Sequence, residues 1–340
     1  MTDIEIRDFE IESAGADDLL GYHRIVAASQ QVDLPDDPPL TYENLVGRLR
    51  NPFTGFGPLR HWTAHRGGEM AGVANMYFPE VENSHLVIAN VRVHPQSRGQ
   101  GIGSTLARAI VPAIRADGRR LVECWQVPKG GTGDSWATRL GFETVHETVQ
   151  QVLLIAEADT SLWEVAAPTG YRLERWIGAA PDALVASYVQ AREAIHDSPL
   201  GQSSMSNPQW TVDRMRAAEA ERRRLDVESR TVVAVHEATG TVAGLTELEV
   251  QPHQPTWAFQ RDTAVLAAHR GHGLGRWIKA HMARWLLADR PDLERFWTTT
   301  GAVNTHMIRV NHQLGFTTTR SAIVLTQSVA TLAARLEAQP

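Results

Sequence analysis

The sequence lacks the features that define several classes of protein. It has a single cysteine, Cys124, so an internal disulfide is impossible and a reducing compartment is expected. No stretch approaches the run of about 18 apolar residues that a membrane-spanning helix needs. The N-terminus alternates acidic and apolar residues and has no apolar core of a signal peptide. These absences predict a soluble, cytoplasmic protein.

An excess of one charge is also small. The 33 Lys and Arg residues against 39 Asp and Glu residues give a formal net charge of −6, which argues against nucleic acid as a partner. The one basic cluster, Arg222-Arg223-Arg224, lies on a helical pattern and is expected to be a solvated face. Cys124 lies in a strand pattern, so we expect a buried small hydrophobe rather than a nucleophile.

A glycine-rich turn occurs twice in the chain. It reads Arg98-Gly99-Gln100-Gly101-Ile102-Gly103 in the first copy and Arg270-Gly271-His272-Gly273-Leu274-Gly275 in the second, 172 residues later. Each turn is followed by a Leu-Gly-Phe sequence, at 140–142 and 314–316, now 174 residues apart. Markers in the same order at a nearly constant offset indicate a duplicated domain.

Each turn joins a strand pattern to a helical pattern. The first N–H groups of a helix have no internal partner, and glycines let a phosphate approach them, so an anion site is predicted. A P-loop would need a Lys that neither copy has, and a dinucleotide fingerprint would need G-x-G-x-x-G. Glu123 follows Gly103 by 20 residues, as a ribose-binding acid would, but the second copy has Thr298-Thr299-Thr300 there. A dehydrogenase is therefore the least favoured alternative.

The pattern R-x-x-G-x-G after a V-x-V strand, with L-G-F about 40 residues later, resembles the GNAT superfamily of acyl-CoA N-acyltransferases. Two copies in one chain resemble the tandem GNAT group, to which mycothiol synthase belongs. The resemblance implies an α+β fold of two domains, each a mixed, mostly antiparallel sheet flanked by helices. We expect them at 1–156 and 170–340, joined by a linker at 157–169.

The hydrophobic periodicity predicts the same order of elements in both halves: a strand, two helices, three strands, a helix, a strand, a helix and a strand. The central strand is expected at 84–94 in the first half and at 257–267 in the second. Thr41 is expected to cap a helix, with Asn44 in its first turn. Residues 328–338 are expected to add a C-terminal helix.

The resemblance implies acyl-CoA, acetyl-CoA or a related thioester, as ligand. Backbone N–H groups of 99–104 and 271–276 would hold its pyrophosphate, and the N–H groups of Val93 and Val265 would stabilise charge on the thioester oxygen. Arg98 is expected either to pair with phosphate or only to fix the turn, as is Arg270. The candidate cofactor-binding residues are Val91, Val93, Arg98, Gly99, Gln100, Gly101, Ile102, Gly103, Ser104, Val265, Arg270, Gly271, His272, Gly273, Leu274, Gly275 and Arg276.

The catalytic positions of the family are only partly matched in this sequence. In many GNAT enzymes a Tyr precedes the Gly of L-G-F by four residues, and an Asn precedes that Tyr by seven. In the second half these positions are Asn311 and Asn304, and Asn311 cannot lose a proton. In the first half they are Ala137 and Gly130. The resemblance thus implies catalysis in the C-terminal domain and a structural acyl-CoA in the N-terminal one. The missing Tyr leaves a non-catalytic acyl-CoA-binding sensor or scaffold as an alternative.

Glu247 and Glu249 lie two residues apart on a predicted strand and therefore share a face. Several GNAT enzymes use a carboxylate from this region, so Glu247 is the candidate base. The alternative is that both glutamates are solvated edge charges. The first half has Asn75 and Tyr77 at the matching positions.

The remaining patterns predict partners only coarsely. The histidines, His306 and His272 included, are expected to be surface or satisfied residues, and their spacing predicts no metal site. The tryptophans are expected to be core residues. The acceptor is expected to be a small-molecule amine, bound by the segments 31–60 and 196–225, which carry no recognisable motif. No nucleic acid and no membrane partner is expected.

Overall fold

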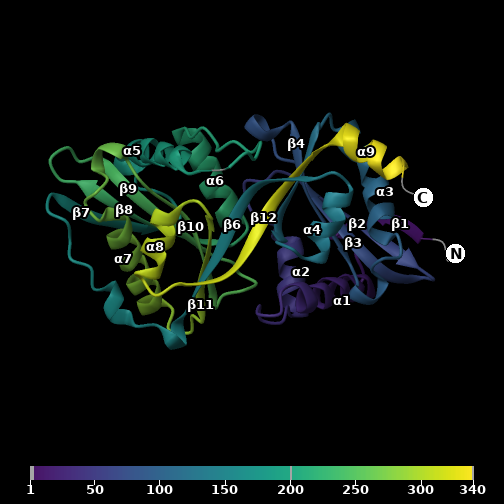
Figure 1. The fold of residues 1–340 in the computed structure, drawn as a ribbon. Coiled ribbons are helices and arrows are strands. Elements are labelled where there is room, and N and C mark those ends of the chain that lie inside the picture. Colours follow the sequence, from purple (N-terminus) through teal and green to yellow (C-terminus); the bar gives the residue numbers. More distant parts are fainter. Residues whose placement is uncertain (1–3, 200, 339–340) are drawn as a thin grey trace. The chain divides into compact units, whose positions relative to one another are not determined.

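The computed structural model of the protein describes residues 4–199 and 201–338. The described chain forms two compact units, which share a fold and are coloured along the sequence in Figure 1. The first unit takes described residues from 1–147, 201–206 and 321–340, and the second takes them from 148–200 and 207–320. The units therefore differ from the predicted division at 156 and 170, because two later segments of the chain belong to the first unit. Within the described residues, no helix is long and apolar enough to cross a membrane.

The first unit is a sheet with helices on both faces. Its strands are β1 (Ile4–Asp8), β2 (Leu59–Arg66), β3 (Glu69–Tyr77), β4 (Leu86–Val93), β5 (Leu121–Pro128) and the end of β12 (Thr317–Ser328), hydrogen-bonded in that order. Its helices are α1 (Ala16–Asp33), α2 (Tyr42–Arg50), α3 (Ile102–Ala116), α4 (Thr132–Arg139) and α9 (Val329–Glu337). The pairing of β4 with β5 is parallel and the others are antiparallel.

Side-chain alternation in the strands divides the core of the first unit into two layers. Val73 of β3 packs with α1 and α2, whereas Ala74 packs with α3 and α9 on the other face. Thr41 begins α2 as predicted, because its Oγ1 accepts the Asn44 N–H at 3.2 Å. Strands β2 and β3 pair antiparallel on either side of Gly67 and form a hairpin.

The second unit repeats this plan. Its strands, in order across the sheet, are β6 (Glu143–Leu154, from residue 148), β11 (Arg295–Gly301), β10 (Trp257–Val265), β9 (Val242–Val250), β8 (Glu228–His236) and β7 (Tyr171–Ile177). Its helices are α5 (Asp182–Arg192), α6 (Val212–Arg224), α7 (Leu274–Asp289) and α8 (Thr305–His312). Here β10 and β11 are the parallel pair. α5 and α6 cover one face, and α7 and α8 the other.

In each unit, the last strand of the sheet is distant in sequence from the strand that it pairs with. In the first unit, residues 322–328 of β12 pair with β5, and Arg108 of α3 donates to the Leu336 carbonyl of α9 at 3.0 Å. Figure 1 shows the yellow helix α9 beside the blue helix α3. In the second unit, residues 148–154 of β6 pair with β11. Alternating apolar residues predicted both strands, but they carry no information about the partner strand, so this exchange was not predicted.

The parallel strands of each unit separate after three residue pairs. β4 and β5 pair from Leu86 to Ile88, and β10 and β11 pair from Trp257 to Phe259. We call the region of β4 and β5 beyond the Ile88–Glu123 pair the first fork, and the region of β10 and β11 beyond the Phe259–Trp297 pair the second fork. A β-bulge between Gln260 and Thr263 bends β10 at the second fork.

Backbone alternation sets which N–H groups point into each fork. The His94 N–H donates to Ala71 of β3 and the Leu266 N–H donates to Ala243 of β9, both at 2.9 Å. Because successive residues of a strand point to opposite sides, the N–H of Val93 is directed away from β3 and into the first fork. By the same alternation, the N–H of Val265 is directed into the second fork.

Candidate active site

Each fork ends at a glycine turn that begins a helix. Gly101 precedes α3 with φ 83°, and Gly273 precedes α7 with φ 76°. Both values lie in the left-handed region, where glycine is not strained and other residues are. A Cβ added to either glycine would meet no described heavy atom within 4 Å. The space above both turns is therefore open, and backbone conformation explains the glycines.

The first N–H groups of both helices lie directly after the glycine turns. The first helical hydrogen bonds are donated by Thr105 to Gly101 at 2.9 Å and by Trp277 to Gly273 at 3.1 Å. The N–H groups of 102–104 and 274–276 precede those bonds, and the N-cap residues, Gly101 and Gly273, have no side chain that could cap them. The helix dipole makes such a set of donors favourable for an anion.

Arg98 fixes the end of β4. Its Nε donates to the Val93 carbonyl at 3.3 Å, and its two terminal nitrogens lie 2.8 and 2.6 Å from the carboxylate oxygens of Asp33 on α1. One of these nitrogens also donates to the Ser29 hydroxyl at 3.1 Å. The guanidinium is thus occupied by the protein, as expected if Arg98 fixes the turn rather than pairs with a phosphate.

Arg270 repeats this arrangement in the second unit. Its Nε donates to the Val265 carbonyl at 3.1 Å, and its guanidinium forms an ion pair with Asp197. The next turn residue, His272, places Nδ1 within 3.2 Å of the His269 carbonyl oxygen and 3.0 Å of the Arg270 carbonyl oxygen. That contact requires a proton on Nδ1, so the other ring nitrogen, Nε2, is the acceptor when the ring is neutral.

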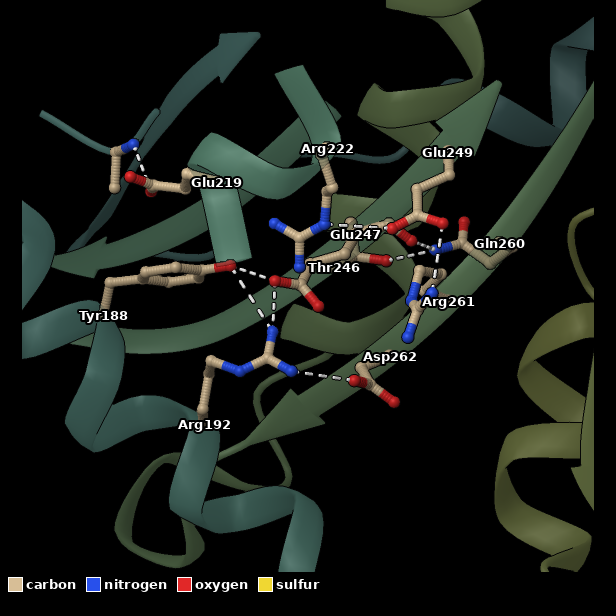
Figure 2. A network of polar contacts seen from close by, with 11 residues as sticks. Tyr188, Arg192, Glu219, Arg222, Thr246, Glu247, Glu249, Gln260, Arg261 and Asp262 are labelled. Atoms are coloured by element: carbon tan, nitrogen blue, oxygen red, sulfur yellow. Dashed lines mark hydrogen bonds and ion pairs between the residues drawn. The ribbon is translucent and has the colours of Figure 1, made fainter. Parts of the chain in front are cut away.

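A buried polar network lies on the face of the second unit that α5 and α6 cover, and Figure 2 shows it. Glu247 of β9 accepts hydrogen bonds from Tyr188 and Arg192 of α5, and Arg192 also pairs with Asp262 of β10 at 3.0 Å. Burial raises the pKa of the Glu247 carboxyl, but the charges of Arg192 and Arg222 and the two hydrogen bonds lower it more. The net pKa lies below the ordinary value, so Glu247 is ionised at neutral pH.

The second glutamate is held in the same way. Glu249 lies between Arg222 of α6 and Arg261 of β10, at 3.1 and 3.0 Å, with 2% of its surface exposed. Glu247 is 5% exposed, so the reading of both as solvated edge charges is wrong. The prediction that the basic cluster is a solvated face is also wrong for Arg222, because its side chain pairs with the buried Glu249. A local charge pattern cannot show which member of a basic run faces the core.

Asp262 is the accessible carboxylate of this network. Its side chain is 36% exposed, against 7% for Glu247 and 4% for Arg192. It lies in the bulge of β10 at the second fork. The sequence analysis did not identify this residue. The 172-residue offset gives Asn90 as the matching residue of the first copy, just as it gives Asn75 for Glu247. Acids of the second copy that replace amides of the first were the signal that could have found it.

The two asparagines of the second copy hold α8. Asn304 caps the helix by accepting the Met307 N–H at 3.1 Å, and Asn311 is 1% exposed and donates to Gln151 at 2.8 Å. In the first unit the glycine run after β5 passes directly into α4, so a helix exists there too. Trp136 of α4 lies 3.5 Å from the Ser104 hydroxyl of α3.

Two other groups have shifted pKa values because of burial. Burial and, second, the charge of Glu123 raise the pKa of the Cys124 thiol to about 12, which agrees with an unreactive cysteine. Burial lowers the pKa of Lys279 on α7 to about 7. In the part of the chain that the structure describes, no three His, Cys, Asp or Glu residues are grouped to hold a metal ion.

The profile of the Acetyltransferase (GNAT) family matches residues 26–133 and 194–316, which together span more than half of the chain. The chain belongs to the GNAT family of acetyltransferases. The match falls once on each copy of the glycine turn, so the predicted tandem of GNAT domains is confirmed.

Known proteins resemble this chain to different extents. Mycothiol acetyltransferase of Nocardia farcinica (strain IFM 10152) is 34% identical over 127 residues, which cover 37% of this chain and 39% of that relative. The tandem GNAT protein from the clavulanic acid biosynthesis pathway, solved without AcCoA, superimposes with a TM-score of 0.78 at 22% identity, covering 96% of this chain and 99% of that chain. A GCN5-related N-acetyltransferase of Sphaerobacter thermophilus gives 0.73 at 15% identity, covering 96% of both chains. These structural similarities establish the fold alone.

Proposed function

We propose that this GNAT protein moves an acetyl or related acyl group from acyl-CoA to the amine of a small metabolite, and that the reaction takes place in the second unit. The observation that carries the proposal is that the second copy has carboxylate side chains at positions where the first copy has none. Glu247, Glu249 and Asp262 belong to the network beside the second fork, where the first copy has Asn75, Tyr77 and Asn90. A protonated amine is attracted to carboxylates and must lose a proton before it attacks.

The backbone supplies the donors for acyl-CoA in this proposal. The N–H groups of 102–104 and 274–276 would hold the pyrophosphate, and the open space above Gly101 and Gly273 leaves room for it. The N–H of Val265 would donate to the thioester carbonyl oxygen, where one such donor is typically worth about 3 kcal/mol of barrier. The candidate cofactor-binding residues of the sequence keep these roles, with Arg98 and Arg270 acting through the turns that they fix.

Asp262 is our candidate for the group that takes the proton of the amine. It is the most exposed acid of the network, and Arg192 holds it in place from buried surroundings. Glu247, the candidate base of the sequence, is mostly enclosed, and its lowered pKa makes it a weak proton acceptor. We therefore assign Glu247 to positioning: it orients Arg192, which orients Asp262.

The leaving group receives no proton from the Tyr position in this proposal. Asn311 stands there, it cannot ionise, and its amide is bound to Gln151. Acyl-CoA, when bound, supplies the acyl group as a thioester, and a thiolate leaves without obligatory protonation at neutral pH. Asn304 contributes by capping α8.

In the first unit we propose a ligand that stabilises the fold and is not consumed. The first turn has the same open glycine at the start of a helix as the second. A ligand that binds only the folded state raises the free energy of unfolding by RT ln(1 + [L]/Kd), which is about 2.7 kcal/mol at a hundredfold excess of ligand over Kd. The first unit would therefore gain stability from acyl-CoA.

A panel of small amines tests the function. Purified protein is mixed with acetyl-CoA, with and without each amine, and release of free thiol is followed. The proposal expects release only when a suitable amine is present. An acyl-CoA-binding sensor is the second candidate, favoured by Asn311 at the Tyr position, and it expects acetyl-CoA binding with no thiol release under any condition.

A further inference from the structure

Glu123 is a carboxylate that the proposed reaction does not use. It is fully buried, and it is the last residue of β5 to pair with β4, so it lies at the start of the first fork. Among the ion pairs formed by the described residues, none involves Glu123. A buried carboxylate without a cation depends on neutral hydrogen-bond donors.

The donors come mainly from a distant part of the chain. The Ser203 hydroxyl lies 3.0 Å from both oxygens of Glu123, and the Ser204 N–H donates at 2.8 Å. The indole N–H of Trp125 adds a bond of 2.8 Å from β5 itself. Ser203 also accepts the N–H of Met205 at 3.1 Å, which leaves its hydroxyl proton for Glu123.

Residues 201–206, which we call the strap, belong to the first unit although α5 and α6 flank them in the chain. The Gln202 N–H donates to the Val145 carbonyl at 2.7 Å at one end of the strap. At the other end, the side chain of Asn83 accepts the Ser206 N–H at 2.8 Å and donates to the Ser206 carbonyl at 2.9 Å. The strap is thus held at both ends and, through Glu123, in its middle.

The strap lies on the face of the first fork that corresponds to the acidic face of the second. Val122 and Cys124 point to the core that α3 covers, so Glu123 points to the opposite face. Glu247 points to the matching face in the second unit, where it meets α5. At the second fork the position of Glu123 is taken by Trp297, which stacks on Phe259 with ring centroids 4.2 Å apart.

We propose that the strap is a built-in occupant of a latent acceptor site in the first unit. The Ser203 hydroxyl and the Ser204 N–H satisfy Glu123 where an acceptor with hydroxyl or amine donors would otherwise bind. The strap thereby keeps acyl-CoA of the first unit away from small nucleophiles. This inference rests on the proposed binding of acyl-CoA at the first turn.

Once the strap is loosened, a small amine reaches the thioester in the first fork. Its nitrogen forms a bond to the acyl carbon, the bond between that carbon and sulfur breaks, and CoA leaves as a thiolate. Glu123 receives the proton that the nitrogen gives up and passes it to solvent. Hydroxylamine is a suitable probe, because it is small and nucleophilic at neutral pH.

The experiment uses full-length protein with Gly273→Val, which disables the second turn. Ser203→Ala with Asn83→Ala removes the side chains that hold the strap. The matched control is Ser204→Ala, because Ser204 contacts Glu123 through its backbone alone. Hydrogen exchange of 201–206, acetyl-CoA retention by native mass spectrometry and hydroxylamine-dependent thiol release are measured on each protein.

We expect the loosened variant to exchange the amides of 201–206 and to release thiol at least tenfold faster than the parent and the control. Faster exchange with retained acetyl-CoA but unchanged thiol release would overturn the latent site. Unchanged exchange would show that these contacts do not hold the strap and would overturn the inference too. A parent that retains no acetyl-CoA would refute the proposed binding at the first turn, and this inference with it.

Discussion

The two glycine turns are closely alike, whereas the surfaces beside their forks are not. In both copies an arginine holds the carbonyl at the end of the central strand and an acidic residue, so Arg98 and Arg270 do the same work. Beside the second fork lies the network of Glu247 and its partners, and beside the first lies the strap over Glu123. The copies share the turn where we propose that a phosphate binds, and they differ in the surface where we propose that an acceptor binds.

In the proposed reaction, this difference separates two requirements, binding of an anion and removal of a proton. Anion binding needs a backbone conformation, which a few glycines and one arginine fix. Proton removal needs an accessible carboxylate, which depends on residues from several elements: Arg192 comes from α5, Glu247 from β9 and Asp262 from β10. Single substitutions can therefore remove the second property from one copy and leave the first intact.

The largest expected effect is loss of one ligand site without loss of the other. Gly273→Val places a β-branched residue at φ 76° and fills the space above the turn, so acetyl-CoA binding in the second unit should be abolished. Gly101→Val should do the same in the first unit. Native mass spectrometry counts the sites: two for the parent and one for each variant. Two acetyl-CoA molecules on either variant would break the comparison.

The next effect concerns the acids. Asp262→Asn should lower turnover about 10²-fold, a usual span for loss of a general base, with little change in acetyl-CoA affinity. The matched control is Asn90→Ala in the first unit, which should leave turnover unchanged. Steady-state kinetics with the best amine of the panel gives both values. If Asp262→Asn retained full turnover, Asp262 would be excluded as the base.

Glu247→Gln separates the two carboxylates. Removing one partner of a buried ion pair typically costs about 3–5 kcal/mol, so this variant should lose stability as well as turnover. Burial raises the pKa of the Glu247 carboxyl, but the charges of Arg192 and Arg222 lower it more, so Glu247 should not act as the base, and the turnover that remains in this variant should keep the pH dependence of the parent. A changed pH dependence of turnover, with an unchanged melting temperature, would assign the base to Glu247.

A smaller effect sharpens the comparison between α3 and α7. Lys279 is buried, and its Nζ lies 5.6 Å from the centroid of the Phe316 ring. The first copy has Ala107 at the matching position. Its folded pKa, about 7, lies below the usual value of about 10.4, so the charged form favours unfolding. The resulting decrease in the free energy of unfolding is absent above about pH 10, grows as the pH falls, and reaches its full size below about pH 7.

Lys279→Met should therefore raise the free energy of unfolding by a few kcal/mol at pH 6 and by much less at pH 10. Denaturant unfolding at the two pH values measures this. Ala107→Gly, which removes a methyl group from the same place in the first unit, should lower stability equally at both pH values. If Lys279→Met raised the free energy of unfolding equally at both pH values, the lowered pKa of Lys279 would be contradicted.

Local patterns predicted most of the elements, because periodicity and caps are properties of neighbouring residues. The start of the helix after Thr41 was predicted correctly, and the C-terminal helix, expected at 328–338, is observed at Val329–Glu337. The pairing of β12 with β5 was not predicted, since the alternation of 317–328 gives a strand and its buried face but no partner.

The candidate site shows the same limit. The turns were predicted from glycine spacing alone, but the contacts of Glu247 with Arg192, a residue 55 positions earlier, depend on how α5 packs on β9. The strap is more distant still, since Ser203 and Glu123 are 80 residues apart. Such contacts between distant elements decide the acidity and exposure of a side chain, and no short pattern records them.

The division of labour between the copies is tested most directly by turnover of the two glycine variants side by side. Gly101→Val and Gly273→Val are assayed for amine-dependent thiol release from acetyl-CoA under the same conditions. The account predicts near-parent turnover for Gly101→Val and turnover near the detection limit for Gly273→Val, because that variant should bind no acetyl-CoA in the second unit. The opposite ranking, or equal losses in both variants, would contradict catalysis in the second unit.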